Sequence, residues 1–95
     1  MNDIVKVSSH SRPAAVAGAV AGIMRENGNV EVRAIGAGAI SQAMKALTIA
    51  RKFLENDDLD LSIVPNFETL NIDGKERTAL RLLVFKRPAS IILGI

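Results

Sequence analysis

Apolar and polar positions along this chain follow two periods, one typical of strands and one typical of helices. Ile4 to Ser8 is short and β-branched and predicts a first strand, and Val30 to Ile35 alternates apolar with charged positions and predicts a second. Leu59 to Ile72 predicts a third strand, in which Pro65 indicates a sheet edge or a bulge because proline cannot donate to a ladder. Arg77 to Arg87 predicts a fourth strand.

The helical period predicts two helices. The first runs from Ala14 to Asn27, with Ser11 or Arg12 as its cap and Gly28 at its end. The second runs from about Ala39 to Leu54. Its predicted apolar stripe consists of Ile40, Ala43, Met44, Leu47, Ala50 and Leu54. Its predicted solvated side consists of Ser41, Lys45, Thr48 and Lys52.

The element order is therefore βαβαββ, with a tight hairpin turn expected at Asp73-Gly74. This order predicts an α+β domain, a two-layer sandwich of two helices on a four-stranded mixed sheet. A length of 95 residues fits one domain, which we place at residues 1–87. Residues 88–95 form an apolar C-terminal tail that we expect to pack on the domain or on a partner subunit.

Glycines mark three places where the backbone needs room or freedom. Gly18 and Gly22 inside the first helix indicate close packing against another element, since glycine costs about 1 kcal/mol there against alanine. Gly36 and Gly38 stand between a strand and a helix but lack the third glycine of a dinucleotide fingerprint, where Ser41 stands. We interpret them as a tight turn for close packing, and the free N–H groups of the helix start leave an anion contact open as the alternative.

Composition argues against most catalytic chemistry. The chain has no cysteine and one histidine, His10, which we interpret as a solvated loop residue, with phosphate contact beside Arg12 as the weaker alternative. Asp57, Asp58 and Asp60 lack the pattern of a calcium loop, so we place them at a helix end and on a solvated strand face. We expect no catalytic residue, metal site, cofactor or small-molecule substrate, and no enzyme.

No signal peptide and no apolar run of about 20 residues is visible in the sequence. We therefore expect a cytoplasmic protein without a membrane partner, with association to the nucleoid as an option. The net charge of +2 permits nucleic acid as a partner but does not require it.

Charge is more suggestive on the predicted hairpin, where Lys75, Arg77 and Arg81 lie beside or beyond the turn. A two-stranded arm with basic side chains can enter a nucleic-acid groove. The alternative is an edge hairpin kept soluble by its charge. The residue pattern alone leaves these two interpretations even.

Three segments, in this order, resemble the stage V sporulation protein S family, and the similarity covers about residues 3–87. They are Val16–Gly22, Ala34–Ala46 and Ile72–Ala79. That family is similar in turn to the Alba group of small chromatin and RNA-binding proteins. The resemblance implies an Alba-like fold, a homodimer that binds DNA or RNA, and a regulatory role in bacterial sporulation or development. The loop after the first strand and the basic hairpin would then lie along the nucleic acid.

On this basis we expect Arg12, Lys75, Arg77 and Arg81 to contact phosphates, with Lys45 and Lys52 as secondary contacts. Alba proteins carry basic residues around the turn into the second helix, where this chain has glycines and alanines. Binding should therefore be weaker and less sensitive to salt. The alternative function is a protein-interaction module that acts through a dimer surface or through the apolar tail.

Overall fold

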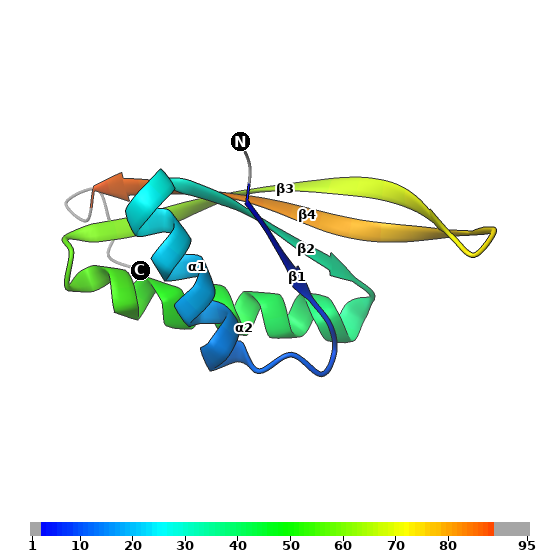
Figure 1. The fold of residues 1–95 in the computed structure, drawn as a ribbon, viewed down its shortest axis with the longest axis horizontal. Coiled ribbons are helices and arrows are strands. Elements are labelled where there is room, and N and C mark those ends of the chain that lie inside the picture. The colour runs from blue at the N-terminus through cyan, green and yellow to red at the C-terminus, as the bar shows by residue number, and fades with distance from the viewer. Residues whose placement is uncertain (1–2, 89–95) are drawn as a thin grey trace.

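Two helices cover one face of a four-stranded sheet in the computed structural model, which describes residues 3–88 (Figure 1). The elements are, in chain order, β1 (Ile4–Val7), α1 (Pro13–Asn27), β2 (Asn29–Ile35), α2 (Ala37–Glu55), β3 (Leu59–Ile72) and β4 (Lys75–Pro88). The predicted βαβαββ order and the two-layer α+β class are confirmed. Residues 89–95, and with them the predicted packing of the apolar tail, lie outside the described range.

The sheet has the strand order β1-β2-β4-β3. β1 runs parallel to β2, whereas β2 and β3 both run antiparallel to β4, so the sheet is mixed as predicted. β3 is an outer strand, which agrees with the edge position that Pro65 indicated. Asp73 (φ 52°) and Gly74 (φ 78°) both lie in the left-handed region and form the expected two-residue turn, closed by the pair of Ile72 and Lys75.

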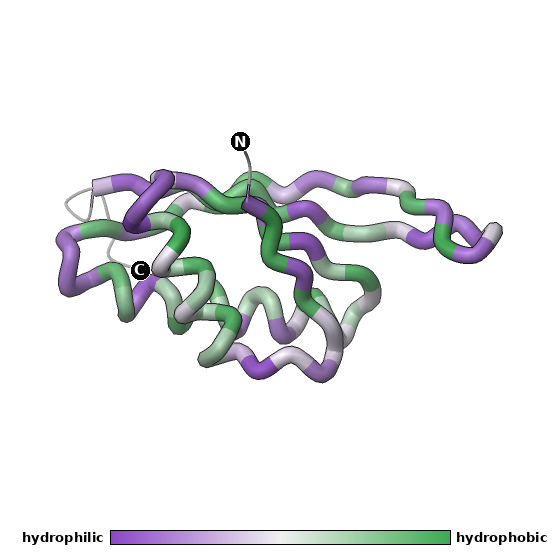
Figure 2. The backbone as a smooth tube through the Cα atoms, viewed as in Figure 1, coloured by the Kyte–Doolittle hydropathy of each residue, from purple (hydrophilic) through white to green (hydrophobic). Residues whose placement is uncertain are grey.

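The hydrophobic core lies between the sheet and the helices. Figure 2 shows how hydrophobic and hydrophilic segments alternate along the strands, which leaves the sheet face opposite the helices more polar. The fully buried large side chains come from both layers: Val20, Met24, Val32, Leu47, Leu54, Leu82 and Val84. Met44 departs from the predicted stripe of α2, because it is 43% exposed, whereas Ala46 is buried in its place.

Both helices begin and end near the predicted residues, but their starts differ in detail. Arg12 precedes Pro13 as the N-cap of α1 without a side-chain cap hydrogen bond. Gly28 ends α1 with φ 81°, and its N–H donates to the Met24 carbonyl at 2.9 Å. α2 begins two residues earlier than predicted, so Gly36 alone separates it from β2. Gly36 has φ 90° and ψ 158°, a conformation in which a side chain would be strained.

The glycines of α1 do not pack as the sequence suggested. A Cβ atom on Gly18 or Gly22 would meet no atom within 4 Å, so the expected close packing is wrong for both. Ala17 and Ala21 are the small residues of α1 that the core buries. Close packing occurs instead at Gly38, where a Cβ atom would lie 2.9 Å from the Cβ of Ser9. Its neighbour is the β1–α1 loop and not the sheet.

Within residues 3–88, no helix is both long enough and apolar enough to cross a membrane.

Candidate nucleic-acid interface

Three segments that are distant in the sequence are neighbours at the base of the β3–β4 hairpin. They are the β1–α1 loop (Ser8–Arg12), the β2–α2 turn at Gly36, and the β3–β4 hairpin, which extends past the helix layer as an arm. We refer to these three segments together as the hairpin end. A pocket lined by Lys6, Ser9, Leu70 and Ile72, among others, shows that the loop borders the base of the arm.

The β1–α1 loop is held by its own hydrogen bonds. The Ser8 N–H donates to Ser11 Oγ at 2.9 Å, and the His10 N–H donates to Ser8 Oγ at 3.1 Å. From α2, Gln42 Nε2 donates to the Ser11 carbonyl at 2.9 Å and fastens the loop to the helix. The serines around His10 therefore shape a turn, and their hydroxyl groups stabilise it.

Two predicted phosphate contacts lie exposed on the arm. Lys75 and Arg77 begin β4 directly after the turn, and neither makes an ion pair with any residue in the described range. Arg12 is exposed at the start of α1. The β4 register places Arg77 and Arg81 on the same face of the sheet.

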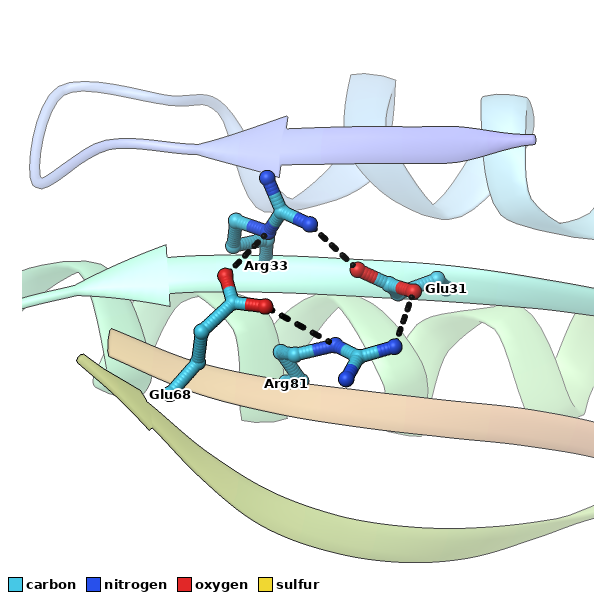
Figure 3. Close-up of polar contacts among 4 residues, drawn as sticks. All are labelled: Glu31, Arg33, Glu68 and Arg81. Carbon is cyan, nitrogen blue, oxygen red and sulfur yellow. Dashed lines mark hydrogen bonds and ion pairs between the residues drawn. The ribbon is translucent and has the colours of Figure 1, made fainter. Parts of the chain in front are cut away.

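Arg81 belongs to a ring of charges on the open face of the sheet (Figure 3). Its Nη2 donates to Glu31 Oε1 at 2.9 Å, and Arg33 Nη2 donates to Glu31 Oε2 at the same distance. Glu68 completes this charge ring, with carboxylate oxygens 3.3 Å from Arg33 Nε and 3.5 Å from Arg81 Nε. Arg33 and Arg81 stand directly opposite each other in the strand register, and the two carboxylates offset their repulsion.

Burial makes this charge ring electrostatically strong. Glu31 is only 4% exposed, and the hydrogen bond from Arg81 lowers its pKa below the ordinary value, helped by Arg33 and opposed by desolvation. The same pair raises the pKa of Arg81. Arg81 therefore offers a phosphate less free charge than Lys75 or Arg77, and its role as a contact stays a prediction.

The predicted secondary contacts lie on α2, on the side away from the core. Lys45 is exposed and its Nζ lies 3.4 Å from Gln42 Oε1, the side chain that holds the loop. Lys52 lies in the last turn of α2, at the opposite end of the molecule from the arm (Figure 1). The structure thus places Lys75 and Arg77 on the arm, Arg81 in the charge ring of the sheet and Arg12 at the start of α1, and it leaves Lys52 apart from all of them.

The aspartate cluster has a structural role that the sequence did not reveal. Asp60, expected on a solvated face, is 2% exposed and accepts hydrogen bonds from Arg51 Nε at 2.7 Å and Arg87 Nη2 at 3.3 Å. The bond from Arg51 is the main reason why its pKa is lowered. Asp57 pairs with Arg25 at 2.7 Å beyond the end of α2. Across residues 3–88, no group of three or more His, Cys, Asp or Glu is placed to hold a metal ion.

Sequence reasoning missed Lys6 and Ser9. Lys6 is exposed on β1 beside Arg33, and Ser9 lies against Gly38 in the loop. Alternation within β1 gave a signal for Lys6, because Val7 on the next position is buried and Lys6 must face the other way. No comparable signal exists for Ser9, whose place depends on the approach of α2.

The fold is that of the Alba proteins. Alba from Thermoplasma volcanium matches this structure with a TM-score of 0.63 and 22% sequence identity, over 87% of this chain and 99% of that one. The family model for stage V sporulation protein S matches residues 3–87. The chain therefore belongs to the stage V sporulation protein S family, and the family resemblance noted in the sequence is confirmed.

Proposed function

We propose that this protein is a small non-enzymatic nucleic-acid-binding protein, active as a homodimer, that regulates sporulation or development. The observation that carries the proposal is the projecting β3–β4 arm, which has the exposed cations Lys75 and Arg77 just after its turn; within residues 3–88 neither makes an ion pair. Arg12 is exposed at the start of α1, where the β1–α1 loop ends. The arm would follow a groove while these side chains contact backbone phosphates.

The charges around the arm favour phosphate contact at its tip. They attract phosphates only weakly elsewhere. Acidic and basic side chains balance between Asn66 and Arg81: Glu68, Asp73 and Glu76 against Lys75, Arg77 and Arg81. Since Glu68 is engaged with Arg33 and Arg81, the cations nearest the turn act locally and not through a broad basic field. We therefore expect moderate affinity and little dependence on base sequence.

Family membership supports the biological part of the proposal. The name of the family supports a role in sporulation, and the Alba neighbour supports nucleic acid as the partner of this fold. A direct binding measurement is therefore the deciding test.

The test is fluorescence anisotropy with labelled duplex DNA, single-stranded DNA and RNA of equal length, at low and at physiological salt. We expect binding that salt weakens, and a further loss in the double variant Lys75→Gln/Arg77→Gln. Lys86→Gln is the matched control, because Lys86 is an exposed cation on β4 at the opposite end of the molecule. Absence of binding to all three ligands at low salt would contradict the proposal.

A protein-interaction module is the second candidate, favoured by large apolar side chains on the surface. Phe67 on β3 is 83% exposed, and Val64 and Phe85 are about half exposed. Removal of residues 88–95, followed by light scattering and partner capture, separates the two candidates. Loss of oligomerisation or of a partner, with nucleic-acid binding unchanged, would favour the interaction module.

A further inference from the structure

A pocket of about 440 Å³ opens beside the arm, on the sheet face opposite the helices. Its volume falls in the roughly 300–1,000 Å³ range of small-molecule sites. The register of the sheet places Lys6 beside Arg33 on this face, and the β1–α1 loop closes one side. The lining residues that matter here are Lys6, Ser9, Arg33, Ile35, Leu70 and Ile72.

Polar groups on one side of this pocket suit an anion. Lys6 and Arg33 are its charged lining residues, and no carboxylate group lines it. Lys6 makes no ion pair in the part of the chain that the structure describes, so its ammonium group is available to a ligand. Arg33 is already held by Glu31 and Glu68, so it is fixed in place and partly neutralised.

Ser9 adds a hydroxyl group in a fixed position. The close approach of Gly38 holds the Cβ of Ser9, and no hydrogen bond to the Ser9 hydroxyl is recorded among residues 3–88. A hydroxyl beside an ammonium group can bind a phosphate oxygen.

Aliphatic side chains form the other side of the pocket. Leu70 and Ile72 extend from β3 and Ile35 ends β2, all on the same sheet face as Lys6. Ile72 is 40% exposed, although its side chain is large and apolar. Exposed apolar side chains of this kind often mark a binding site. Apolar side chains can hold the face of a base that has left its stack, although they are weaker platforms than aromatic rings.

From this arrangement we infer that the pocket binds one unstacked nucleotide, with its phosphate at Lys6 and Ser9 and its base against Leu70 and Ile72. The inference rests on the proposed function and sharpens it, since a strand that enters the pocket must be single-stranded there. The ligand chemistry is a nucleoside phosphate, supplied either by a single-stranded nucleic acid or by a free mononucleotide. The cations near the turn would bind duplex and single-stranded nucleic acid alike, whereas the pocket would bind only a single strand.

Two pocket variants with matched controls test the inference. Lys6→Gln removes the free charge, and Lys86→Gln is its control, because Lys86 is an exposed cation at the end of β4 remote from the turn. Ile72→Ala removes part of the apolar wall, and Val64→Ala is its control, because Val64 lies on the same face of β3 but outside the pocket. Each variant is titrated by anisotropy with single-stranded and blunt duplex oligonucleotides of equal length.

We expect both pocket variants to weaken single-strand binding about threefold to tenfold and to leave duplex binding nearly unchanged. The two controls should match the wild type on both ligands. An equal loss on duplex and single strand, or the same loss in Val64→Ala as in Ile72→Ala, would overturn the pocket while leaving nucleic-acid binding intact.

An NMR titration of the unmodified protein with adenosine monophosphate identifies the source of the ligand. Shifts confined to the amides of Lys6, Ser9, Leu70 and Ile72 would support a nucleotide site even if no oligonucleotide bound, and the ligand would then be a free nucleotide. Inorganic phosphate is the control probe. Identical shifts with phosphate alone, or no shift with the nucleotide, would overturn the inference.

Discussion

Gly38 allows the β1–α1 loop to pack against the start of α2, because glycine has no Cβ atom. The Cβ atom of any other residue would lie 2.9 Å from Ser9 Cβ, which is too close for the loop to stay where it is. Gly38→Ala should destabilise the protein by about 1–2 kcal/mol, because crowding exceeds the gain in helix propensity. The measurement is the free energy of unfolding in urea.

Gly18→Ala provides the matched comparison, with the opposite sign expected. A Cβ atom at Gly18 meets nothing within 4 Å, so alanine brings only its helix propensity and stabilises by up to about 1 kcal/mol. If both variants change stability in the same direction, the close contact between Gly38 and Ser9 does not govern the position of the loop.

Glu31 is the residue on which the charge ring depends. Glu31→Gln removes a buried carboxylate and leaves Arg33 and Arg81 facing each other. We expect a loss of about 2 kcal/mol, below the roughly 3–5 kcal/mol of a fully buried pair, since both arginines keep contact with water. Urea unfolding measures this loss, and Glu76→Gln on the exposed arm is the control that should change little.

At the scale of elements, ion pairs join three strands of the sheet to one another and one strand to a helix. The charge ring connects β2, β4 and β3, and Asp60 connects β3 to β4 and to Arg51 of α2. Asp60 therefore joins the two layers of the sandwich through Arg51, whereas Glu31 joins strands within the sheet. The stability of the fold therefore depends on the charge states of Glu31 and Asp60.

This arrangement predicts acid sensitivity. The pKa values of Glu31 and Asp60 are lowered by their arginine partners, so the unfolded chain takes up protons at a higher pH than the folded chain. Their contribution is fully present at neutral pH and is lost progressively as the pH falls below about 4, the ordinary range of carboxyl groups. Urea midpoints measured between pH 7 and pH 3 should fall, and they should fall less steeply in Glu31→Gln.

Local signals predicted the elements well, because each depends on neighbouring residues. Pro13 and Gly28 bound α1, and Asp73-Gly74 forms the turn that its dipeptide indicates. Pro65 lies in an outer strand because it cannot donate to a ladder. These features need no knowledge of the distant chain.

Long-range pairing could not be predicted in the same way. Arg81 is 50 positions from Glu31, and their contact depends on the register between β2 and β4, which no local pattern sets. The burial of Asp60 likewise depends on Arg51 and Arg87 arriving from other elements. The sequence therefore predicted the cations of the arm but not which of them already have partners.

At the scale of the whole molecule, arginines and lysines divide their roles. Most arginines hold the fold through carboxylate partners, namely Arg25, Arg33, Arg51, Arg81 and Arg87. No lysine in residues 3–88 makes an ion pair. The planar arginine fork suits paired contacts, whereas lysine remains a hydrated point charge available to a ligand.

This division predicts how steeply salt weakens binding. Four cations on β1, on the β1–α1 loop and on the arm make no ion pair in the part of the chain that the structure describes: Lys6, Arg12, Lys75 and Arg77. If each neutralises one phosphate, the slope of log affinity against log salt for duplex DNA is about −3.5 per protomer and about −7 for a dimer that uses both ends. Anisotropy titrations at several salt concentrations, with the oligomeric state measured by light scattering, give this slope. A slope near zero would contradict phosphate contact.

The hydrogen bonds that hold the β1–α1 loop also affect the entropy cost of binding a ligand. The loop is folded on itself and held by Gln42 and by the contact at Gly38, so its conformation exists before any ligand arrives. Ordering a free loop would cost roughly 1–2 kcal/mol for each residue. Association at this end of the molecule avoids that entropy loss. A few phosphate contacts can therefore retain a ligand, because little of their free energy goes into ordering the protein.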